Sequence, residues 1–517
     1  MKKLPDLVKK VLEYNQPDSS KWNEWLENLD LFPVSQSDCI NQFVECMLEI
    51  KEKNEKVLIA GDYDCDGIMA TTIMMDGLTR FGIECGFYIP DRLKEGYGLH
   101  ESTVQMANQK GYTVILTVDN GVKASNALAF AHTLGMKTIV TDHHTIDEKV
   151  NCDILVHPDY MEDCFSTLCG AALAYECVRA LNKDTDFHLM CASVASISDV
   201  MKVTNQTRAI IQNGLKKLNE SKELHFFSLS NDLVMNETTI GYQIAPKLNA
   251  VGRLSDLANV NNVVRYFLCD DEKMIQSFSM QIDRLNNRRK EMSASIVADA
   301  MLQCHQLQDI YLVCDDSYHE GMIGLASNAL CKKFNKPVIV MTSNHHSYKA
   351  SMRSPEGFHC LEFLSGFARY ETLGGHAQAA GFSVHEDNYK DFENYVYSRI
   401  QTYEWNGKIK SVLQVQEEEI TLSSLKDLDM IRPFGPGFIL PVFEIVHPEI
   451  KSIYDFKYGM HRKYVLNNGL QCMLFNQSDK DKYKKNNPIA SIEGTVSISY
   501  YQNRQSASFT IDEIIYE

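Results

Sequence analysis

The spacing of apolar positions changes several times along the chain, and each change predicts a different kind of element. Residues 1–50 have helical spacing, with Leu7 and Val11 among the apolar positions, and predict a helical lead-in. Across residues 51–240, short apolar runs alternate with amphipathic stretches of helical length. This alternation is typical of βαβ units and predicts a domain built on a parallel sheet.

The second half of the chain has three further patterns. Residues 241–305 are polar with helical spacing, and few helix breakers lie between Met274 and Gln303, which predicts one long connecting helix. Residues 306–400 return to apolar runs and helical stretches and predict a second α/β unit. Residues 401–517 contain the turn-rich Pro433–Gly437 and then short alternating runs, which predict a small β-barrel.

Composition places the chain among ordinary globular proteins. Its 517 residues are too many for one core and predict about two to four domains. No apolar run reaches the roughly 18 residues of a membrane span, and no apolar segment of a secretory signal follows Met1–Asp6. The fifteen cysteines include no C-x-x-C pair, which is typical of reduced thiols. We therefore predict a cytoplasmic protein that does not engage a membrane.

The formal net charge is −17. It argues against a protein that coats nucleic acid without specificity, because phosphates and an acidic surface repel each other. A nucleic-acid enzyme with a local basic groove is compatible with this charge, since a metal site itself requires many carboxylates.

Short acidic and histidine-bearing stretches carry the candidate chemistry, and most of them follow an apolar run of β type. The carboxyl ends of parallel strands meet at one crevice, so we expect these stretches to converge there. Crowded aspartates repel one another unless a cation compensates, and oxygen ligands with imidazole favour Mn²⁺ or Mg²⁺ over a thiolate zinc site. The stretches are Asp62-x-Asp64-x-Asp66-Gly67, Val118-Asp119-Asn120-Gly121, Asp142-His143-His144, His157-Pro158-Asp159 and Ser198-Asp199-Val200.

A calcium loop is the alternative for the first stretch, since EF-hands also contain Asp-x-Asp-x-Asp-Gly. That loop requires a bidentate glutamate where this chain has Ile73, and helices on both sides instead of a strand and a helix. A single Asp-x-Asp is more often a turn or a helix cap, and adjacent histidines in an exposed loop are usually solvated. The combination of all the stretches in one βα series therefore favours the divalent-metal site.

Two ions held by bridging carboxylates would activate a water and neutralise a phosphoryl transition state, so we expect Mn²⁺ or Mg²⁺, with two ions bound. Asp62 and His144 are predicted to be ligands or to lie directly behind them. Asp142 is predicted to orient a histidine by accepting its second N–H, and it completes the predicted catalytic set. The predicted direct ligands are Asp64, Asp66, Asp119, His143 and Asp199.

The order of these stretches resembles the DHH phosphoesterase superfamily, whose motif is here Asp142-His143-His144. Further motifs narrow the resemblance to RecJ-type nucleases and extend it over about residues 40–445. These motifs are Arg92-x-x-x-Gly96-Tyr97-Gly98-Leu99, Ile244-Ala245-Pro246-Lys247-Leu248-Asn249-Ala250-x-Gly252-Arg253, His319–Gly324, Ser351–Ser354, Gly374–Ala377 and Pro433–Gly437.

The resemblance implies an α/β fold in which a DHH-type parallel-sheet domain is joined by a long helix to a second α/β, DHH-associated domain. A C-terminal oligonucleotide-binding (OB) β-barrel follows. The resemblance also implies Mn²⁺- or Mg²⁺-dependent 5′→3′ degradation of single-stranded DNA to mononucleotides, in DNA repair and recombination. Helicases and single-strand-binding proteins are then candidate partners, and we expect a monomer.

The resemblance also implies a set of substrate-binding residues. Arginine forks grip a terminal phosphate bidentately, although a surface salt bridge is the alternative for any single arginine. Arg92, Arg253, Ser351 and Arg353 match positions that hold the 5′ end and its phosphate. His319 and His376 match positions that line the cleft from the associated domain, and Tyr97 and Asn249 are predicted to contact substrate within their motifs.

The chain departs from the family pattern at two places. Lys247 stands where the family usually has arginine, which keeps the charge but loses the planar fork. The C-terminal region is not strongly basic, so we expect a weaker grip on DNA there. Its candidate contacts are Lys457, Arg462, Lys463, Tyr464, Tyr500, Tyr501 and Arg504, in which aromatic faces would stack on bases.

Three other functions compete with the exonuclease. A DHH phosphodiesterase acting on short oligonucleotides or cyclic dinucleotides is the main alternative, but such members are typically shorter and lack the barrel. A non-catalytic scaffold is disfavoured because every expected ligand position is filled. A polyphosphate-cleaving enzyme shares the first domain, but the motifs after residue 240 do not suit it.

Overall fold

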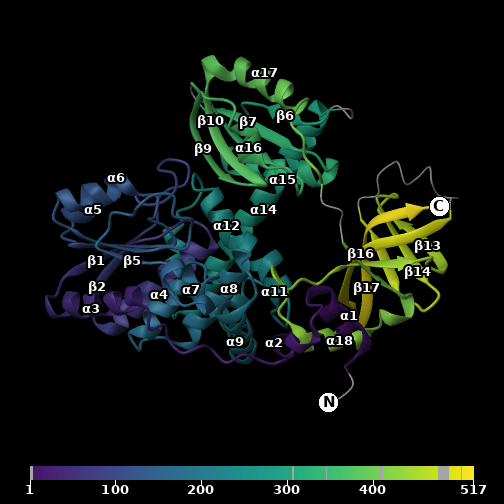
Figure 1. Ribbon diagram of the computed structural model, residues 1–517, viewed down its shortest axis with the longest axis horizontal. Helices are drawn as coiled ribbons and strands as arrows, with labels where there is room; N and C mark the ends of the chain where they lie inside the picture. The colour runs from purple at the N-terminus through teal and green to yellow at the C-terminus, as the bar shows by residue number, and fades with distance from the viewer. Residues whose placement is uncertain (1–3, 305–307, 345, 408–410, 476–487, 502–503) are drawn as a thin grey trace.

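The computed structural model describes residues 4–304, 308–344, 346–407, 411–475, 488–501 and 504–517. These residues form three sheets, one after another along the chain, and each sheet has its own layers of helices or strands. A long helix joins the first two sheets (Figure 1). None of the described helices is long and apolar enough to cross a membrane.

The first sheet is parallel throughout, as the alternating pattern predicts. Its strand order is β2-β1-β3-β4-β5, so the connections cross over the sheet. Successive residues of a strand enter opposite cores, as Leu58 and Ile59 do on β1. The strands are β1 (Lys56–Ala60), β2 (Glu84–Tyr88), β3 (Val114–Val118), β4 (Lys137–Thr141) and β5 (Ile154–Val156).

Helices cover both faces of this sheet (Figure 1). The core that contains Leu58 is closed by α5 (Glu101–Gln109) and α6 (Ser125–Thr133). The core that contains Ile59 is closed by α3 (Asp38–Glu52), α4 (Cys65–Phe81), α7 (Gly170–Ala180), α8 (Asp186–Ser198) and α9 (Asn205–Ser221). The resulting three-layer arrangement confirms the predicted α/β domain.

Helices also form the connection between the first two sheets. The predicted long helix is confirmed as α14 (Glu272–Gln303), which begins two residues before the predicted start and ends where predicted. Asp271 caps it by accepting from the backbone N–H groups of Lys273 and Met274. The preceding elements are α10 (Leu224–Phe227), α11 (Glu237–Thr239), the π-helical turn Ile240–Ile244, α12 (Ala245–Arg253) and α13 (Asn261–Phe267).

The second sheet has the order β6-β7-β8-β10-β9, with only the pair β6–β7 parallel among its described strands. Helix α15 and the end of α14 cover one face, and α16 and α17 cover the other. Its elements are β6 (Tyr311–Cys314), α15 (Glu320–Phe334), β7 (Val338–Asn344), β8 (Ser347–Arg353), α16 (Cys360–Leu364), β9 (Tyr370–His376), β10 (Ala379–His385) and α17 (Tyr389–Ile400).

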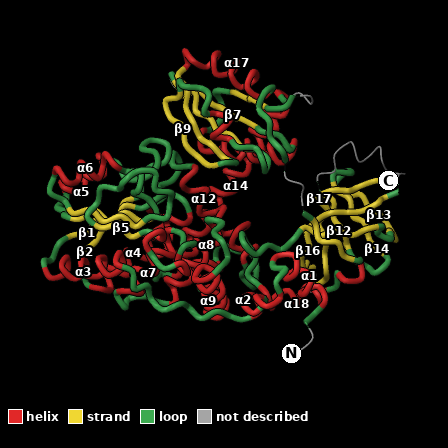
Figure 2. The backbone as a smooth tube through the Cα atoms, in the orientation of Figure 1, coloured by secondary structure: helices red, strands yellow, loops and turns green. Residues whose placement is uncertain are grey.

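The C-terminal domain is a mixed sheet of the order β11-β12-β16-β17-β15-β14-β13 over its described strands (Figure 2). The short strands that the sequence predicts are present, but β16 and β17 are much longer, at 13 residues each. The elements are β11 (Val412–Val415), α18 (Leu422–Asp427), β12 (Val442–Val446), β13 (Ile450–Phe456), β14 (His461–Leu466), β15 (Gln471–Leu474), β16 (Ile489–Tyr501) and β17 (Arg504–Tyr516).

Helix α1 (Asp6–Asn15) packs in this C-terminal domain, at the opposite end of the chain (Figure 1). Leu7, Val8, Val11 and Leu12 are buried in the same core as Phe443, and α2 (Asn23–Leu26) adds Trp25 to that core. Helix α3 packs on the first sheet instead. The predicted helical lead-in is therefore shared by two domains, because helical spacing defines an apolar face but not its partner.

We expect Leu12→Ala to destabilise the C-terminal domain by about 2–5 kcal/mol, since the side chain is fully buried in that core. Guanidinium unfolding followed by tryptophan fluorescence measures the loss, because Trp22 and Trp25 lie in the same core. Glu13→Ala, on the exposed side of the same helix, is the matched control. Equal stability of the two variants would show that α1 contributes nothing to this domain.

Candidate metal centre and anion pocket

The strand order brings the predicted acidic stretches to one edge of the first sheet. Asp62, Asp119 and Asp142 follow β1, β3 and β4, which are parallel neighbours in the sheet. Asp199 belongs to a different element: it directly follows the last residue of α8 and caps that helix. Asp119 has a left-handed backbone, with φ of 60°, which a non-glycine residue adopts only where the surroundings impose it.

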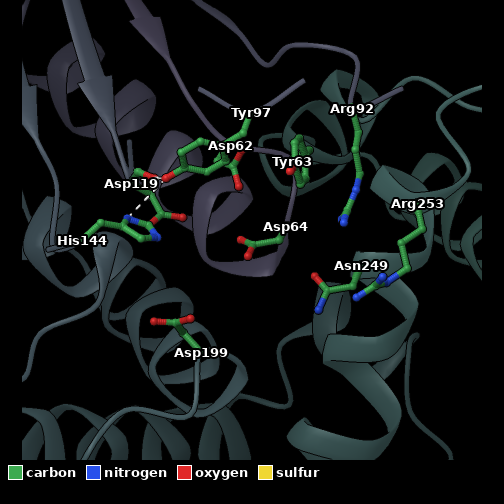
Figure 3. Close-up of a pocket in the computed structure, with 10 residues that line it drawn as sticks. All are labelled: Asp62, Tyr63, Asp64, Arg92, Tyr97, Asp119, His144, Asp199, Asn249 and Arg253. Atoms are coloured by element: carbon green, nitrogen blue, oxygen red, sulfur yellow. Dashed lines mark hydrogen bonds between the residues drawn. The ribbon is translucent and has the colours of Figure 1, made fainter. Parts of the chain in front are cut away.

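These residues face a cavity of about 270 Å³, with acidic side chains at one side and arginines at the other (Figure 3). Of the predicted catalytic and metal-binding residues, Asp66, Asp142 and His143 do not line the cavity itself. Asp142 and His143 contact residues that do, and candidate ligand atoms of Asp66 and Asp199 lie within 4.8 Å of each other. The lining residues are Asp62, Tyr63, Asp64, Arg92, Tyr97, Asp119, His144, Asp199, Asn249 and Arg253.

His143 lies at the centre of the carboxylates. Its Nε2 is 3.2 Å from Oδ1 of Asp119, 3.6 Å from Oδ2 of Asp199 and 3.7 Å from Oδ2 of Asp66. Burial lowers the pKa of His143, although the charge of Asp66 acts in the other direction. A neutral imidazole nitrogen among three carboxylates is a suitable metal ligand.

The acidic groups require a cation. Burial and neighbouring aspartates raise the pKa of Asp62 and Asp119 well above its usual range, and they raise that of Asp199 to about 8. Oδ1 of Asp62 and Oδ1 of Asp119 are buried and accept no hydrogen bond among the described residues. A bound divalent ion would supply the missing partner, so the donor set fits Mn²⁺ or Mg²⁺.

The candidate ligand atoms form three overlapping groups, and within each group they lie within 4.8 Å of one another. Asp119 belongs to two groups and His143 to two, which is the arrangement expected where bridging ligands serve two ions. The groups are Asp62, Asp64 and Asp119; Asp66, His143 and Asp199; and Asp119, His143 and His144.

The N-terminus of α7 holds Asp66 in place. The backbone N–H of Gly170 donates to Oδ2 and that of Ala171 donates to Oδ1, each at 2.8 Å. A Cβ at Gly170 would lie 2.4 Å from Cβ of Asp119. Glycine is therefore required where the helix approaches both carboxylates.

Asp142 contacts the motif histidine without lining the cavity itself. Its Oδ1 lies 2.8 Å from Nδ1 of His144, and its Oδ2 accepts from the backbone N–H of Val122. Although burial opposes the charged form, this contact raises the pKa of His144. With Nδ1 occupied, Nε2 is the ring nitrogen of His144 that a metal ion could use.

The stretch His157-Pro158-Asp159 does not belong to the cavity. His157 is buried, and its Nε2 lies 3.0 Å from the carbonyl oxygen of His144. Asp159 is exposed. The expectation that all five stretches form one site is therefore wrong for this one, which supports the histidine loop from behind.

An arginine cluster forms the other side of the cavity. Burial lowers the pKa of Arg253 to about 10, with further contributions from Arg92, Arg353 and Arg289. Arg92 lies over the ring of Tyr63, with 4.7 Å between Cζ and the ring centroid, and forms no ion pair among the described residues. Cations gathered without carboxylate partners constitute an anion site.

Arg289, on α14, was not predicted from the sequence. Its charge depresses the pKa of Arg253, and its buried Nε has no hydrogen-bond partner in the described part of the chain. It lies in a helix with many charged residues, where no motif distinguishes it. Asn286, one turn earlier, is 3% exposed, but this burial is visible only in the structure, so the sequence carried no signal for Arg289.

Helix α12 is held against the metal loop. Asn249 lines the cavity, and its Oδ1 accepts from the backbone N–H of Cys65 at 2.7 Å. Lys247, the departure from the family pattern, pairs with Asp283 on α14 at 2.5 Å and donates to the carbonyl of Leu229. Lys247 therefore anchors the helix and does not line the cavity.

The residues predicted from the second domain lie at different places. Arg353 donates to Oγ of Ser351 at 2.9 Å, and its charge acts on Arg253, so this pair extends the arginine cluster. His319 caps α15 and contacts Asp256. His376 is exposed on β9 and does not line the cavity.

The DNA contacts predicted in the C-terminal domain also differ in their exposure. Arg462 is 2% exposed and bound to Asp455, and Tyr464 is 3% exposed, so neither is available to nucleic acid. Lys463 lies over the ring of the exposed Tyr454, with Nζ 5.3 Å from the centroid. The side chains of Tyr500 and Tyr501 lie outside the described residues.

Comparison with known proteins agrees with this layout. Residues 56–198 match the DHH family, N-terminal domain, residues 307–402 match the DHHA1 domain, and residues 411–513 match the RecJ OB domain. The chain thus has the domain set of a RecJ-type member of the DHH superfamily. This confirms the predicted superfamily and the predicted combination of domains.

Relatives of the RecJ type match most of the chain. The single-stranded-DNA-specific exonuclease RecJ of Bacillus subtilis is 29% identical over 487 residues, which are 89% of this chain but only 61% of that protein. The Haemophilus influenzae protein of the same name is 26% identical over 447 residues, which are 78% of this chain and 77% of that protein.

A solved structure shows the same fold. The crystal structure of RecJ from Thermus thermophilus in complex with Mn²⁺ superposes with a TM-score of 0.85 and 21% identity. The match covers 99% of this chain and 76% of that one.

We expect Gly170→Ala to weaken Mn²⁺ binding by roughly 10- to 100-fold, the usual effect of disturbing a group that orients a metal ligand. The added methyl group would displace Asp119, as the 2.4 Å approach requires. Titration calorimetry with Mn²⁺ measures the affinity, and Gly241→Ala, where a Cβ meets nothing within 4 Å, is the control. Unchanged affinity in Gly170→Ala would contradict the assigned packing of α7.

Proposed function

We propose that this protein is a divalent-metal-dependent exonuclease that degrades single-stranded DNA to mononucleotides from the 5′ end. One observation carries the proposal: a single cavity joins carboxylates and a histidine to arginines that form no ion pair with a carboxylate within the described part of the chain. A phosphodiester placed between them would meet both groups. The DNA specificity is supported by the printed names of the relatives, and the polarity by the resemblance of the motifs.

Mn²⁺ or Mg²⁺ is the proposed cofactor, and when bound it would activate a water and neutralise charge on the phosphoryl group. The residues proposed to hold two such ions are Asp62, Asp64, Asp66, Asp119, His143, His144 and Asp199. Asp142 is proposed to keep His144 in the tautomer that offers Nε2, since it occupies Nδ1.

The arginines would determine which part of a strand enters the cavity. Arg92, Arg253 and Arg353 are proposed to bind the 5′ phosphate, and Arg289 adds charge from α14. A terminal phosphate carries more negative charge than an internal diester, so this cluster favours an end over a continuing strand. Tyr97, Asn249, His319, Ser351 and His376 remain proposed substrate contacts, of which Tyr97 and Asn249 line the cavity.

The presence of the C-terminal domain supports long DNA strands as the substrate. The alternative substrates are short oligonucleotides and cyclic dinucleotides. A substrate that small would need only the cavity, whereas this chain also has a domain that matches the RecJ OB domain. The exposed Tyr454 and the half-buried Lys463, on neighbouring strands, are proposed to contact the DNA strand there, through stacking and charge.

The cellular setting follows from this activity. We propose a role in DNA repair and recombination in the cytoplasm, where a helicase and a single-strand-binding protein would supply and cover the strand. We further propose that the protein works as a monomer, since this chain supplies both the candidate metal ligands and the arginines that the proposed chemistry requires.

The proposal is tested by digesting one single strand labelled at its 5′ end and the same strand labelled at its 3′ end. With Mn²⁺ or Mg²⁺, the 5′ label should appear at once in mononucleotides, and EDTA should abolish hydrolysis. His143→Ala should lose at least about 100-fold in kcat, since disturbing a group that only orients a ligand already costs roughly 10- to 100-fold. His385→Ala, in a partly exposed position of the second domain, is the control. Immediate release of the 3′ label would show that degradation runs from the 3′ end and would contradict the proposed polarity.

Arg353→Ala should raise KM for 5′-phosphorylated strands by roughly 10- to 100-fold, because a charge-assisted hydrogen bond contributes about 1.5–3 kcal/mol. Its effect on strands with a 5′ hydroxyl should be much smaller. Arg369→Ala, which removes an exposed ion pair with Asp391 in the same domain, is the matched control. A lower kcat with unchanged KM would indicate a role in the chemical step instead of end binding.

A further inference from the structure

Arg208, on α9, is a buried cation outside the catalytic site. It is 1% exposed, and burial lowers its pKa to about 10. No carboxylate accepts a hydrogen bond from it among the described residues. Its acceptors are instead backbone carbonyls at 3.1–3.2 Å, those of Trp25, Ile431, Arg432 and Pro433.

These carbonyls belong to two separate segments of the chain. Trp25, in α2, lies within the segment that leads from α1, in the C-terminal core, to α3 on the first sheet. Residues 431–433 lie within the C-terminal domain, between α18 and the turn that precedes β12. One guanidinium therefore holds both segments against a helix of the catalytic domain.

Aromatic rings enclose this contact. The rings of Trp25 and Phe438 stack with centroids 4.1 Å apart, and Cζ of Arg208 lies 4.9 Å from the first and 5.5 Å from the second. A guanidinium combines planar stacking with several donors, and a lysine ammonium has no such planar group.

Neighbouring bonds join the same surfaces. The backbone N–H of Val203 donates to the carbonyl of Pro436 at 2.7 Å, and Val203 follows closely after Asp199. Gln212 accepts from the N–H of Leu29 and donates to the carbonyl of Arg432. Glu237 pairs with Arg432 and accepts from the N–H of Phe434. The contact is thus a network between the catalytic and C-terminal domains.

We propose that Arg208 is a positioning residue that fixes the C-terminal domain relative to the cavity, so that a strand bound to that domain reaches the metal centre in line. This inference rests on the proposed function. It assigns Arg208 to the use of long strands and leaves hydrolysis of the shortest ones to the cavity. When two binding sites lose their mutual alignment, the affinity gained by occupying both is lost.

The test compares Arg208→Met with the unaltered protein on short and long 5′-phosphorylated strands in Mn²⁺. The short strand is at the lower limit of about 4 nucleotides that an OB fold covers. KM for the long strand should rise about tenfold or more, while kcat on both lengths and KM for the short strand stay within about twofold. Lys216→Ala, which changes an exposed residue of the same helix, should leave kcat and KM unchanged on both strand lengths. Equal losses on both lengths, or an unchanged KM for the long strand, would overturn the inference.

Gln212→Leu is the second variant in case Arg208→Met folds poorly. It removes one bond to each of the two segments, and a smaller rise in KM for the long strand alone is expected. No change in that KM would count against the network.

Two readouts do not depend on catalysis. Hydrogen exchange of amides 431–438 should accelerate in Arg208→Met while strand β16 stays protected, and long strands should bind more weakly in EDTA by fluorescence anisotropy. If the unaltered protein cleaves nothing, the proposed function fails, yet these two measurements still decide the role of Arg208. Unchanged exchange and unchanged binding would reject it.

Discussion

Repulsion among buried carboxylates is the constraint on which the structure around the site depends. Asp62, Asp64 and Asp119 are gathered where burial opposes their charge, and such a group is stable only with compensation. Part of that compensation is built into the fold. The first amides of α7 donate to Asp66, and the loop carrying Asp142 fixes the motif histidines. The remainder is left to the cation that the proposed chemistry requires, so metal binding and local stability are coupled.

The same constraint explains an acidic protein that is proposed to act on a polyanion. A net charge of −17 describes the whole surface, whereas the substrate would encounter a cavity with arginines along one side. Because salt screens charges beyond roughly 10 Å, the local arrangement of Arg92, Arg253 and Arg353 matters more than the total. Burial of these side chains strengthens their interaction with phosphate, since fewer waters compete.

The local pattern was sufficient to predict the parallel sheet, the long helix and the acidic residues at the strand ends, because each depends on residues near one another in the chain. It did not predict interactions made between distant segments. Arg289 has no motif, and the partner of α1 is a core formed by residues from the other end of the chain. Burial of Arg462 and Tyr464 depends on the pairing of β13 with β14 and on Asp455. His157 resembles a ligand in sequence, but the loop beside it turns its ring toward a backbone carbonyl.

The place of α1 has a consequence for synthesis on the ribosome. This helix precedes the catalytic domain in the chain, but elements that pack against it, such as α18 and β11, follow that domain. The catalytic sheet is complete long before they are synthesised and can fold as a unit. Until these elements appear, Leu7, Val8, Val11 and Leu12 remain uncovered, so the nascent chain carries an apolar helix that a chaperone would recognise. Closure of the C-terminal core therefore follows synthesis of the catalytic sheet, and it joins segments on either side of the catalytic domain.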